Sequence, residues 1–115
     1  GIVEFGCARY NENGIDWLFR VVKDMFQNSL SIRCGGSAAL GLCRAASGSN
    51  TVYLELKLQP YDYAAASVIL EEAGGMITQI DGSSITFHEG CSIIGGTPSA
   101  WRESKEAFEK YREEN

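Results

Sequence analysis

The sequence predicts an α/β protein in which a mixed β-sheet is flanked by helices. Residues 51–58 alternate apolar and polar side chains, which is the pattern of a strand with one buried face. Residues 15–27 are typical of an amphipathic helix whose apolar stripe packs in the core, formed by Leu18, Val21, Val22, Met25 and Phe26. Short loops with glycine or a capping residue separate such segments, so strands and helices alternate along the chain.

The expected elements follow from these patterns in chain order. We expect strands near residues 2–8, 29–33, 51–58, 76–80, 84–87 and 91–95. We expect helices near residues 15–27, 37–47, 62–73 and 98–113. The third strand should place one apolar set on one face and one mixed set on the other: Val52, Leu54, Leu56 and Leu58 against Tyr53, Glu55 and Lys57. The strands should form one mixed sheet with the helices packed against it.

Residues at the helix ends support these boundaries. Ser37 is the expected N-cap of the second helix, because a serine oxygen accepts a hydrogen bond from a backbone N–H of the first turn. Gly48 and Gly74 are placed to end the second and third helices, since glycine tolerates the left-handed conformation common at helix ends. Thr97 followed by Pro98 indicates the start of the last helix.

Two junctions between a strand and a helix carry polar groups that could form a site. The turn Cys34–Ser37 contains two glycines and leads into an alanine-rich helix. Unpaired N–H groups in the first turn of a helix, with the helix dipole behind them, favour anions. Asp62 lies at the second junction, just after the strand 51–58. Because open α/β sheets bind ligands at the carboxyl ends of their strands, the junctions predict an anion site beside an acid.

Length and composition are those of an ordinary globular domain, with 115 residues, 44% apolar and 22% charged. A net charge of −5 and the lack of a basic stripe argue against a nucleic-acid surface. The sequence contains no apolar run near the roughly 20 residues of a membrane-spanning helix. Its cysteines form no Cys-x-x-Cys pair, which favours free thiols in a reducing cytoplasm. We therefore expect a cytoplasmic protein without a nucleic-acid or membrane partner.

Five segments between Ser29 and Pro98 follow one another in a specific order. They are Arg33–Leu40, Tyr53–Glu55, Tyr61–Ala66, Glu71–Gly75 and Ile93–Pro98. In this order, with Glu55 seven residues before Asp62, they resemble the C-terminal half of the inositol monophosphatase family. Its members are magnesium-dependent, lithium-sensitive phosphomonoesterases related to fructose-bisphosphatase and to bisphosphate nucleotidases. The resemblance implies the layered sandwich of that family and a small phosphorylated polyol, sugar or nucleotide as substrate.

The resemblance also implies roles for individual residues. Asp62 matches the family's C-terminal metal-ligand aspartate, which also contacts the substrate, and it is the candidate catalytic residue and Mg2+ ligand. Gly36, Ser37 and Ala38 match the segment that touches the substrate through its backbone and a hydroxyl. Glu55 matches the acid that hydrogen-bonds a substrate hydroxyl.

The sequence departs from the family pattern in three ways. Tyr61 stands where tryptophan is usual, and Thr51 stands where many members carry aspartate, so substrate identity is more in question than the chemistry. The family's N-terminal half supplies a glutamate and an Asp-Pro-Ile-Asp-Gly-Thr segment, and neither has a match here. We therefore expect residues 1–115 to be a single domain, the C-terminal half of a longer phosphatase, and inactive alone. A homodimer of the full-length protein is compatible with the resemblance.

Each candidate residue also has a purely structural interpretation. Asp62 could act only as an N-cap, and Glu55 could face solvent and pair with Lys57 or Arg44. The Asp81-Gly82 pair imitates part of the missing acidic segment, but its position between two short strands predicts a type I′ hairpin turn. The whole chain could also be a non-catalytic interaction or regulatory module that keeps the fold. An acidic Asp-x-x-Asp-Gly segment upstream would indicate the enzyme instead.

Overall fold

The computed structural model describes residues 1–6, 12–27, 31–35, 37–48, 51–86 and 90–113. Within them, strands form one sheet in the order β2-β1-β3-β5-β4. The strands are β1 (Ile2–Gly6), β2 (Ser31–Gly35), β3 (Val52–Leu58), β4 (Met76–Thr78) and β5 (Cys91–Gly96). β1 pairs in parallel with β2 and β3, whereas β5 pairs antiparallel with β3 and β4. The predicted mixed sheet is thereby confirmed.

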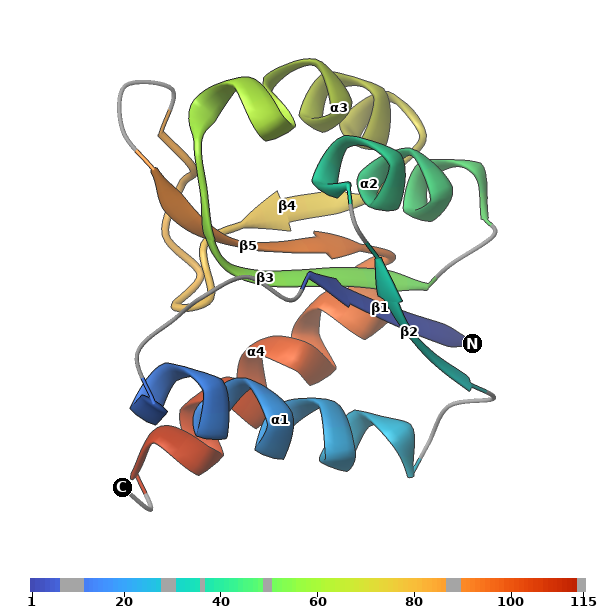
Figure 1. The fold of residues 1–115 in the computed structure, drawn as a ribbon. Helices are drawn as coiled ribbons and strands as arrows, with labels where there is room; N and C mark the ends of the chain where they lie inside the picture. Colours follow the sequence, from blue (N-terminus) through green and yellow to red (C-terminus); the bar gives the residue numbers. More distant parts are fainter. Residues whose placement is uncertain (7–11, 28–30, 36, 49–50, 87–89, 114–115) are drawn as a thin grey trace.

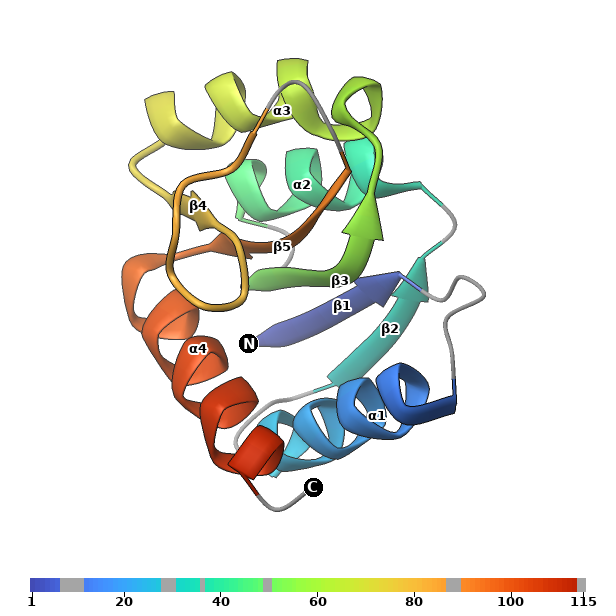
Figure 2. The same ribbon diagram turned by 90° about the vertical axis from the view of Figure 1, so that its left-hand side faces the viewer.

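Helices cover both faces of this sheet, so the molecule has three layers (Figure 1). The helices are α1 (Glu12–Phe26), α2 (Ala38–Ser47), α3 (Pro60–Glu72) and α4 (Pro98–Glu113). The pair α2 and α3 lies on one face, and the pair α1 and α4 lies on the other (Figure 2). In the described part of the chain, every helix is too short or too polar to cross a bilayer.

Each face of the sheet has its own buried apolar cluster. The cluster on the side of α1 and α4 includes Val3, Leu18, Leu54, Ile94 and Phe108. The cluster on the side of α2 and α3 includes Leu42, Tyr53, Tyr63, Leu70 and Ile93. These clusters show that the strands of the sheet bury side chains on both faces.

The predicted faces of β3 are correct except at its end. Val52 and Leu54 belong to the cluster beneath α1 and α4, and Tyr53 belongs to the opposite one, as alternation requires. Leu58, however, packs with Tyr53 and not with Leu54. The register between β3 and β5 shifts between Glu55 and Leu58, and such an irregularity changes which face a side chain occupies.

The predicted glycine ends of α2 and α3 and the predicted start of α4 are confirmed, whereas α1 begins at Glu12 and α3 at Pro60, earlier than the expected positions 15 and 62. Gly48 and Gly74 have φ values of 89° and 87°, in the left-handed region. After α3, the N–H of Gly74 donates to the carbonyl of Glu71 and that of Gly75 to the carbonyl of Leu70, which is a Schellman motif. At the start of α4, the Thr97 hydroxyl accepts from the backbone N–H of Ala100 at 3.3 Å. These ends therefore depend on local residues alone.

The expected strand 84–87 is absent from its described part, residues 84–86. Two of its backbone carbonyls accept hydrogen bonds from side chains and not from a neighbouring strand. Gln79 Nε2 donates to the carbonyl of Ser84, and the Tyr63 hydroxyl donates to that of Thr86. Asp81 lies in a turn as predicted, but φ is positive at Gly82 only, so the turn is not of type I′. The Asp81 carboxylate accepts from Ser83 N–H and hydroxyl groups, which occupies it within the turn.

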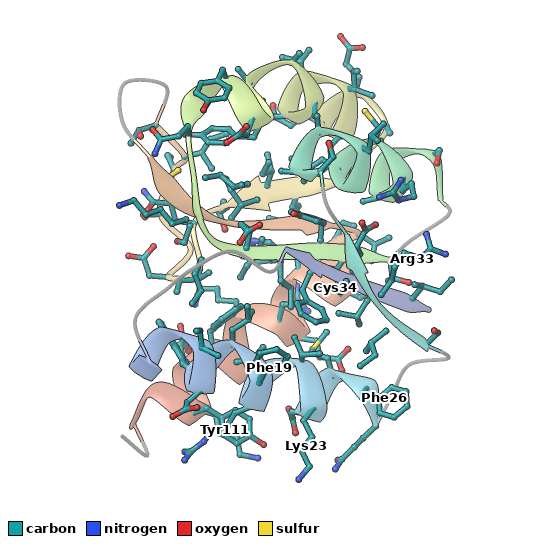
Figure 3. The ribbon with its side chains drawn as sticks, viewed as in Figure 1. Phe19, Lys23, Phe26, Arg33, Cys34 and Tyr111 are labelled. Carbon is teal, nitrogen blue, oxygen red and sulfur yellow. The ribbon has the colours of Figure 1, made fainter. Side chains whose placement is uncertain are left out.

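One predicted core residue of α1 lies outside the core. Leu18, Val21, Val22 and Met25 are buried as expected, but Phe26 is 48% exposed. Phe26 lies at the end of the helix near β2, the edge strand of the sheet (Figure 3). Arg33 and Cys34 of β2 are exposed as well. The β2 edge is thus only partly covered by α1.

Candidate functional site

The predicted site residues that the structure describes lie in β3 and at the starts of α2 and α3: Ser37 and Ala38 follow β2, Glu55 lies in β3, and Asp62 follows β3. β1, β2 and β3 are parallel to one another, so their carboxyl ends meet at one edge of the sheet. Both α2 and α3 begin after such an end, as the sequence predicts. This is the position at which open α/β sheets bind ligands.

At the first junction, Ser37 is the N-cap of α2. Its hydroxyl oxygen accepts a hydrogen bond from the backbone N–H of Leu40 at 3.3 Å, which confirms the predicted cap. Ala38 is the first residue of α2 and is buried. Gly36 lies outside the described residues. The helix is ten residues long, and its dipole places a partial positive charge at this first turn.

At the second junction, Asp62 lies within the first turn of α3 and not before it. The helix begins at Pro60, whose fixed φ suits the first helical position, so Asp62 is the third residue of the helix. Asp62 Oδ2 accepts a hydrogen bond from the Gln59 backbone N–H at 3.0 Å. Gln59 is the N-cap of α3, so the interpretation of Asp62 as the N-cap is wrong, although Asp62 takes part in a capping box with Gln59. One such bond leaves a carboxylate with further acceptor sites, so it does not exclude cation binding.

Glu55 is buried and does not face solvent, so its structural interpretation is wrong. Its side chain lies on the α2 and α3 side of β3 and is only 4% exposed. Oε1 accepts a hydrogen bond from the Tyr53 hydroxyl at 3.2 Å. Oε2 is buried and has no hydrogen-bond partner among the described residues. Lys57 is exposed, and Arg44 pairs with another carboxylate.

The environment of Glu55 changes its acidity. Burial, with the charge of Asp62 as a further cause, raises the pKa of Glu55 from 4.5 to about 7. Burial also raises the pKa of the Tyr53 hydroxyl, so this group remains a neutral donor at all ordinary pH values. Near neutral pH, Glu55 is therefore present in both its protonated and its ionised form. Perturbed carboxyl groups of this kind are frequent in functional sites and are also found in structural networks.

Arg44 bonds to Glu4, a residue that the sequence analysis did not single out. Glu4 lies in β1 with its side chain fully buried on the same face as Glu55. Arg44 of α2 donates from Nε and Nη2 to the two Glu4 oxygens, at 2.9 and 2.6 Å. A carboxylate inside an apolar strand and one arginine in an alanine-rich helix were the available signals. The pair fixes α2, and thereby Ser37 and Ala38, against the sheet.

The described residues contain no group of three or more acids, histidines or cysteines that could hold a metal ion. Asp62 is a half-buried carboxylate with free acceptor capacity, which suits a hard cation such as Mg2+. Six oxygen ligands are typical for magnesium, so Asp62 could supply only part of such a site.

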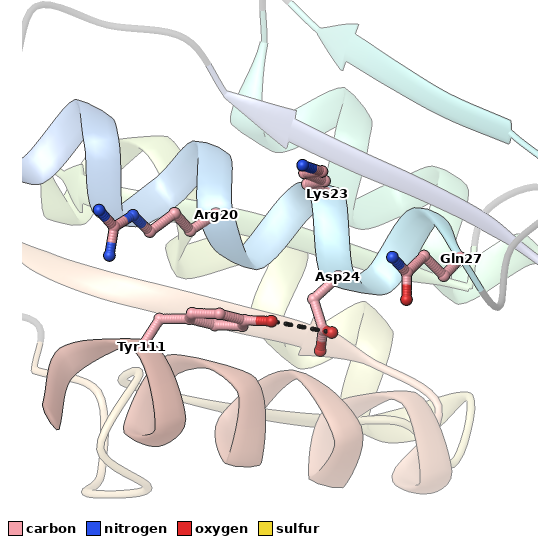
Figure 4. A pocket seen from close by; sticks show the side chains of 5 residues that line it. All are labelled: Arg20, Lys23, Asp24, Gln27 and Tyr111. Atoms are coloured by element: carbon pink, nitrogen blue, oxygen red, sulfur yellow. Dashed lines mark hydrogen bonds between the residues drawn. The ribbon is translucent and has the colours of Figure 1, made fainter. Parts of the chain in front are cut away.

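A separate groove of about 320 Å3 lies between α1 and α4, on the other face of the sheet (Figure 4). It is lined by Arg20, Lys23, Asp24, Gln27 and Tyr111. The Tyr111 hydroxyl donates to the Asp24 carboxylate at 3.1 Å and so joins the two helices. None of the predicted site residues lines this groove. It is thus distinct from the strand-end site.

Comparison with known families identifies the chain. The model of the inositol monophosphatase family matches residues 8–115, which is nearly the whole sequence. The chain belongs to the inositol monophosphatase family. The resemblance of the five sequence segments is thereby confirmed.

Matches to individual members of the inositol monophosphatase family show what share of each relative's length corresponds to this chain. It is 44% identical over 79 residues to an inositol-1-monophosphatase of Bacillus subtilis, a match covering 69% of the chain and 29% of the relative. It is 31% identical over 97 residues to a putative Nus factor SuhB of Neisseria meningitidis, covering 84% of the chain and 37% of that protein. The chain thus spans about a third of the length of the curated relatives it matches.

Solved structures agree with the family fold. Inositol monophosphatase-II of Staphylococcus aureus superposes with a TM-score of 0.77 and 29% identity, covering 93% of this chain and 39% of that chain. Structures of SaIMPase-II with bound inositol monophosphate and with bound 2′AMP give TM-scores of 0.79 and 0.74. The fold prediction of an inositol monophosphatase-like α/β sandwich is therefore confirmed.

Proposed function

We propose that this chain is the C-terminal half of a magnesium-dependent phosphomonoesterase that hydrolyses a small phosphorylated polyol, sugar or nucleotide. The observation that carries the proposal is Glu55, a buried carboxyl group of β3 whose Oε2 has no partner among the described residues and whose pKa is affected by the charge of Asp62. Family membership and the phosphorylated ligands of SaIMPase-II support the substrate class.

In this proposal each site residue has a separate role. Bound Mg2+ supplies the positive charge that neutralises the phosphate and makes water a better nucleophile. Asp62 holds one side of the metal site and orients the ester oxygen. Ser37 and Ala38 position the substrate at the start of α2, where the helix dipole favours an anion. Glu55 accepts a hydrogen bond from a substrate hydroxyl and so fixes the alcohol part.

The outer surfaces of α2 and α3 support a longer protein. Leu40 of α2 and Val68 and Ile69 of α3 are 58%, 54% and 49% exposed in this chain. Helices with apolar residues on all sides are normally buried. Since the matched segment is only 29% of the Bacillus subtilis relative's length, the proposal assigns this surface to contact with the remainder of the protein. The remainder would also bring the other metal ligands, so the 115-residue chain alone should have little activity.

The alternative is a non-catalytic interaction or regulatory module that keeps the fold. The name of the SuhB relatives, a Nus factor, is the observation that favours this alternative. The sequence that precedes this chain in its gene discriminates the two. An acidic Asp-x-x-Asp-Gly segment there supports the enzyme, and its absence supports the module.

Two substitutions in the full-length protein test the proposed roles. Asp62→Asn removes a charged metal ligand and should lower kcat by several orders of magnitude, because electrostatic stabilisation of the transition state is lost. Glu55→Gln keeps the shape and an acceptor oxygen, so it should alter substrate preference by about 1–3 kcal/mol with nearly unchanged affinity for Mg2+. Steady-state kinetics and magnesium titration measure both effects.

Two results from the same variants would contradict the proposed roles. An Asp62→Asn protein that keeps its activity but unfolds at lower temperature would show that Asp62 acts only in the capping box of α3. Equal losses of kcat from both substitutions would show that the two acids do not have separate roles. Either result would favour the binding module.

A further inference from the structure

We propose that Tyr53 is a positioning residue for Glu55: its hydroxyl holds Oε1, so that Oε2 is the oxygen offered to a substrate hydroxyl. Gly6 leaves the space that this arrangement needs. The inference deepens the proposed function and rests on it. It assigns to Tyr53 part of the preference for esters that carry a free hydroxyl beside the phosphate.

Tyr53 and Glu55 lie two residues apart on β3, so both side chains project from the same face of the sheet. Both are buried, with exposed fractions of 1% and 4%. The Tyr53 hydroxyl donates to Glu55 Oε1 at 3.2 Å, while Oε2 has no partner in the described structure. The two carboxylate oxygens therefore differ: Oε1 is held by Tyr53, whereas Oε2 is buried and has no partner among the described residues.

The neighbouring strand fits around this pair. In the pairing of β1 with β3, Phe5 lies opposite Leu54, so Gly6 follows next to Glu55. A methyl group on Gly6 would overlap with Glu55 Oε1 and would also come within 2.5 Å of the Tyr53 hydroxyl oxygen. Any larger residue would therefore force Glu55 out of this position. Glycine at the end of β1 is needed for the close approach of the two side chains.

The ring of Tyr53 also contacts the other half of the site. A methyl group on Gly41 of α2 would overlap with this ring, so the ring lies directly against the helix backbone. α2 begins with Ser37 and Ala38, the residues proposed to touch the substrate. Tyr53 thus sets the distance between α2 and β3 while its hydroxyl orients Glu55. It connects the group that fixes the alcohol with the helix that faces the phosphate.

The chemical consequence is recognition at two points of the substrate. A carboxylate oxygen without a protein partner is a strong acceptor for an alcohol hydroxyl. In a Tyr53→Phe variant, neither oxygen of Glu55 would have a partner among the described residues, and the carboxyl group could rotate or take up a proton. The variant should then bind hydroxyl-bearing esters more weakly and should treat esters without a hydroxyl as before.

The kinetic test uses the full-length protein with Tyr53→Phe and the control Tyr63→Phe. Tyr63 is a buried tyrosine on the same face, but its hydroxyl donates to the carbonyl of Thr86. For inositol monophosphate, Tyr53→Phe should raise KM about tenfold and change kcat by less than about twofold. For p-nitrophenyl phosphate, which has no neighbouring hydroxyl, neither variant should change KM. Equal effects on both esters, or the same effect from Tyr63→Phe, would overturn the proposal.

A second measurement does not need activity. In the 115-residue chain, NMR titration of the Glu55 carboxyl carbon should give a higher pKa in Tyr53→Phe, because the donor to the ionised form is lost. The charge of Asp62 acts on the pKa of Glu55, Tyr53 donates a hydrogen bond to it, and the ion pair of Glu4 and Arg44 lies on the same face of the sheet. Tyr63→Phe replaces none of these groups. An unchanged pKa would overturn the positioning role even in an active enzyme. A full-length parent without phosphatase activity would instead overturn the proposed function, and with it the substrate role of Tyr53.

Discussion

Glu55→Gln should stabilise this chain at neutral and alkaline pH and leave its stability near pH 4.5 almost unchanged. The reason is the buried position of Glu55, whose Oε2 has no partner among the described residues. Burial disfavours the ionised form of a carboxyl group but not the neutral one. Glutamine is always neutral and has nearly the same shape. The difference in unfolding free energy between the two proteins therefore measures how much the charge of Glu55 destabilises the fold.

The sign and size follow from the pKa of Glu55, which is raised from 4.5 in its ordinary state to about 7 in the folded chain. Between these values the folded state binds more protons than the unfolded state, so stability falls as the pH rises. Stability from this group is fully present below pH 4.5 and is lost as the pH passes about 7. Each pKa unit corresponds to about 1.4 kcal/mol, so the loss reaches at most about 3 kcal/mol.

Urea unfolding of the parent and the variant from pH 4.5 to pH 8.5, followed by tryptophan fluorescence, measures this loss. Other titrating groups cancel in the difference between the two curves, since both proteins contain them. Glu71→Gln, the same chemical change at an exposed position of α3, serves as control and should shift stability by less than about 0.5 kcal/mol. Parallel stability curves for parent and Glu55→Gln would refute the reasoning, because Glu55 would then be ionised in a solvated environment.

Two further predictions concern the other carboxylates. Arg44→Met should lower the midpoint of urea unfolding, because the buried Glu4 carboxylate would lose both charge-assisted hydrogen bonds from Arg44, and a second change, Glu4→Gln, should recover most of the loss. Equal stability of Arg44→Met and the parent would show that the two Arg44 hydrogen bonds contribute little to the stability of the fold. Calorimetric titration of the 115-residue chain with Mg2+ should show no tight site, since Asp62 cannot supply the six oxygens that magnesium prefers; a tight site would mean that the metal ligands are misplaced.

The features that the sequence predicted well depend on neighbouring residues. α2 is preceded by Ser37 and followed by Gly48, and α4 begins at Pro98, as their capping residues indicate. Alternation places Val52 and Tyr53 on opposite faces of β3 because the side-chain period of a strand is two. These features need no knowledge of distant parts of the chain.

The features that the sequence did not predict depend on contacts between distant segments. The pair Glu4 and Arg44 joins residues 40 positions apart, and neither residue alone distinguishes a buried ion pair from a surface charge. Leu58 changed face because of a register shift with β5, which alternation within β3 cannot show. The strand expected at 84–87 failed because side chains of Gln79 and Tyr63 bind carbonyls of the described part of that segment.

The contrast between Asp62 and Glu55 bears on whether the site has a function. Asp62 has an evident structural role in the first turn of α3, so its presence alone proves nothing about chemistry. Glu55 caps no helix, lies on a buried face of β3, and has a pKa that burial raises, so its ionised form is disfavoured in the fold. Tyr53 and Gly6 nevertheless hold it in one position. Residues that are unfavourable for folding stability are expected mainly where they are needed for function. For this reason Glu55 supports the proposed function more strongly than Asp62 does.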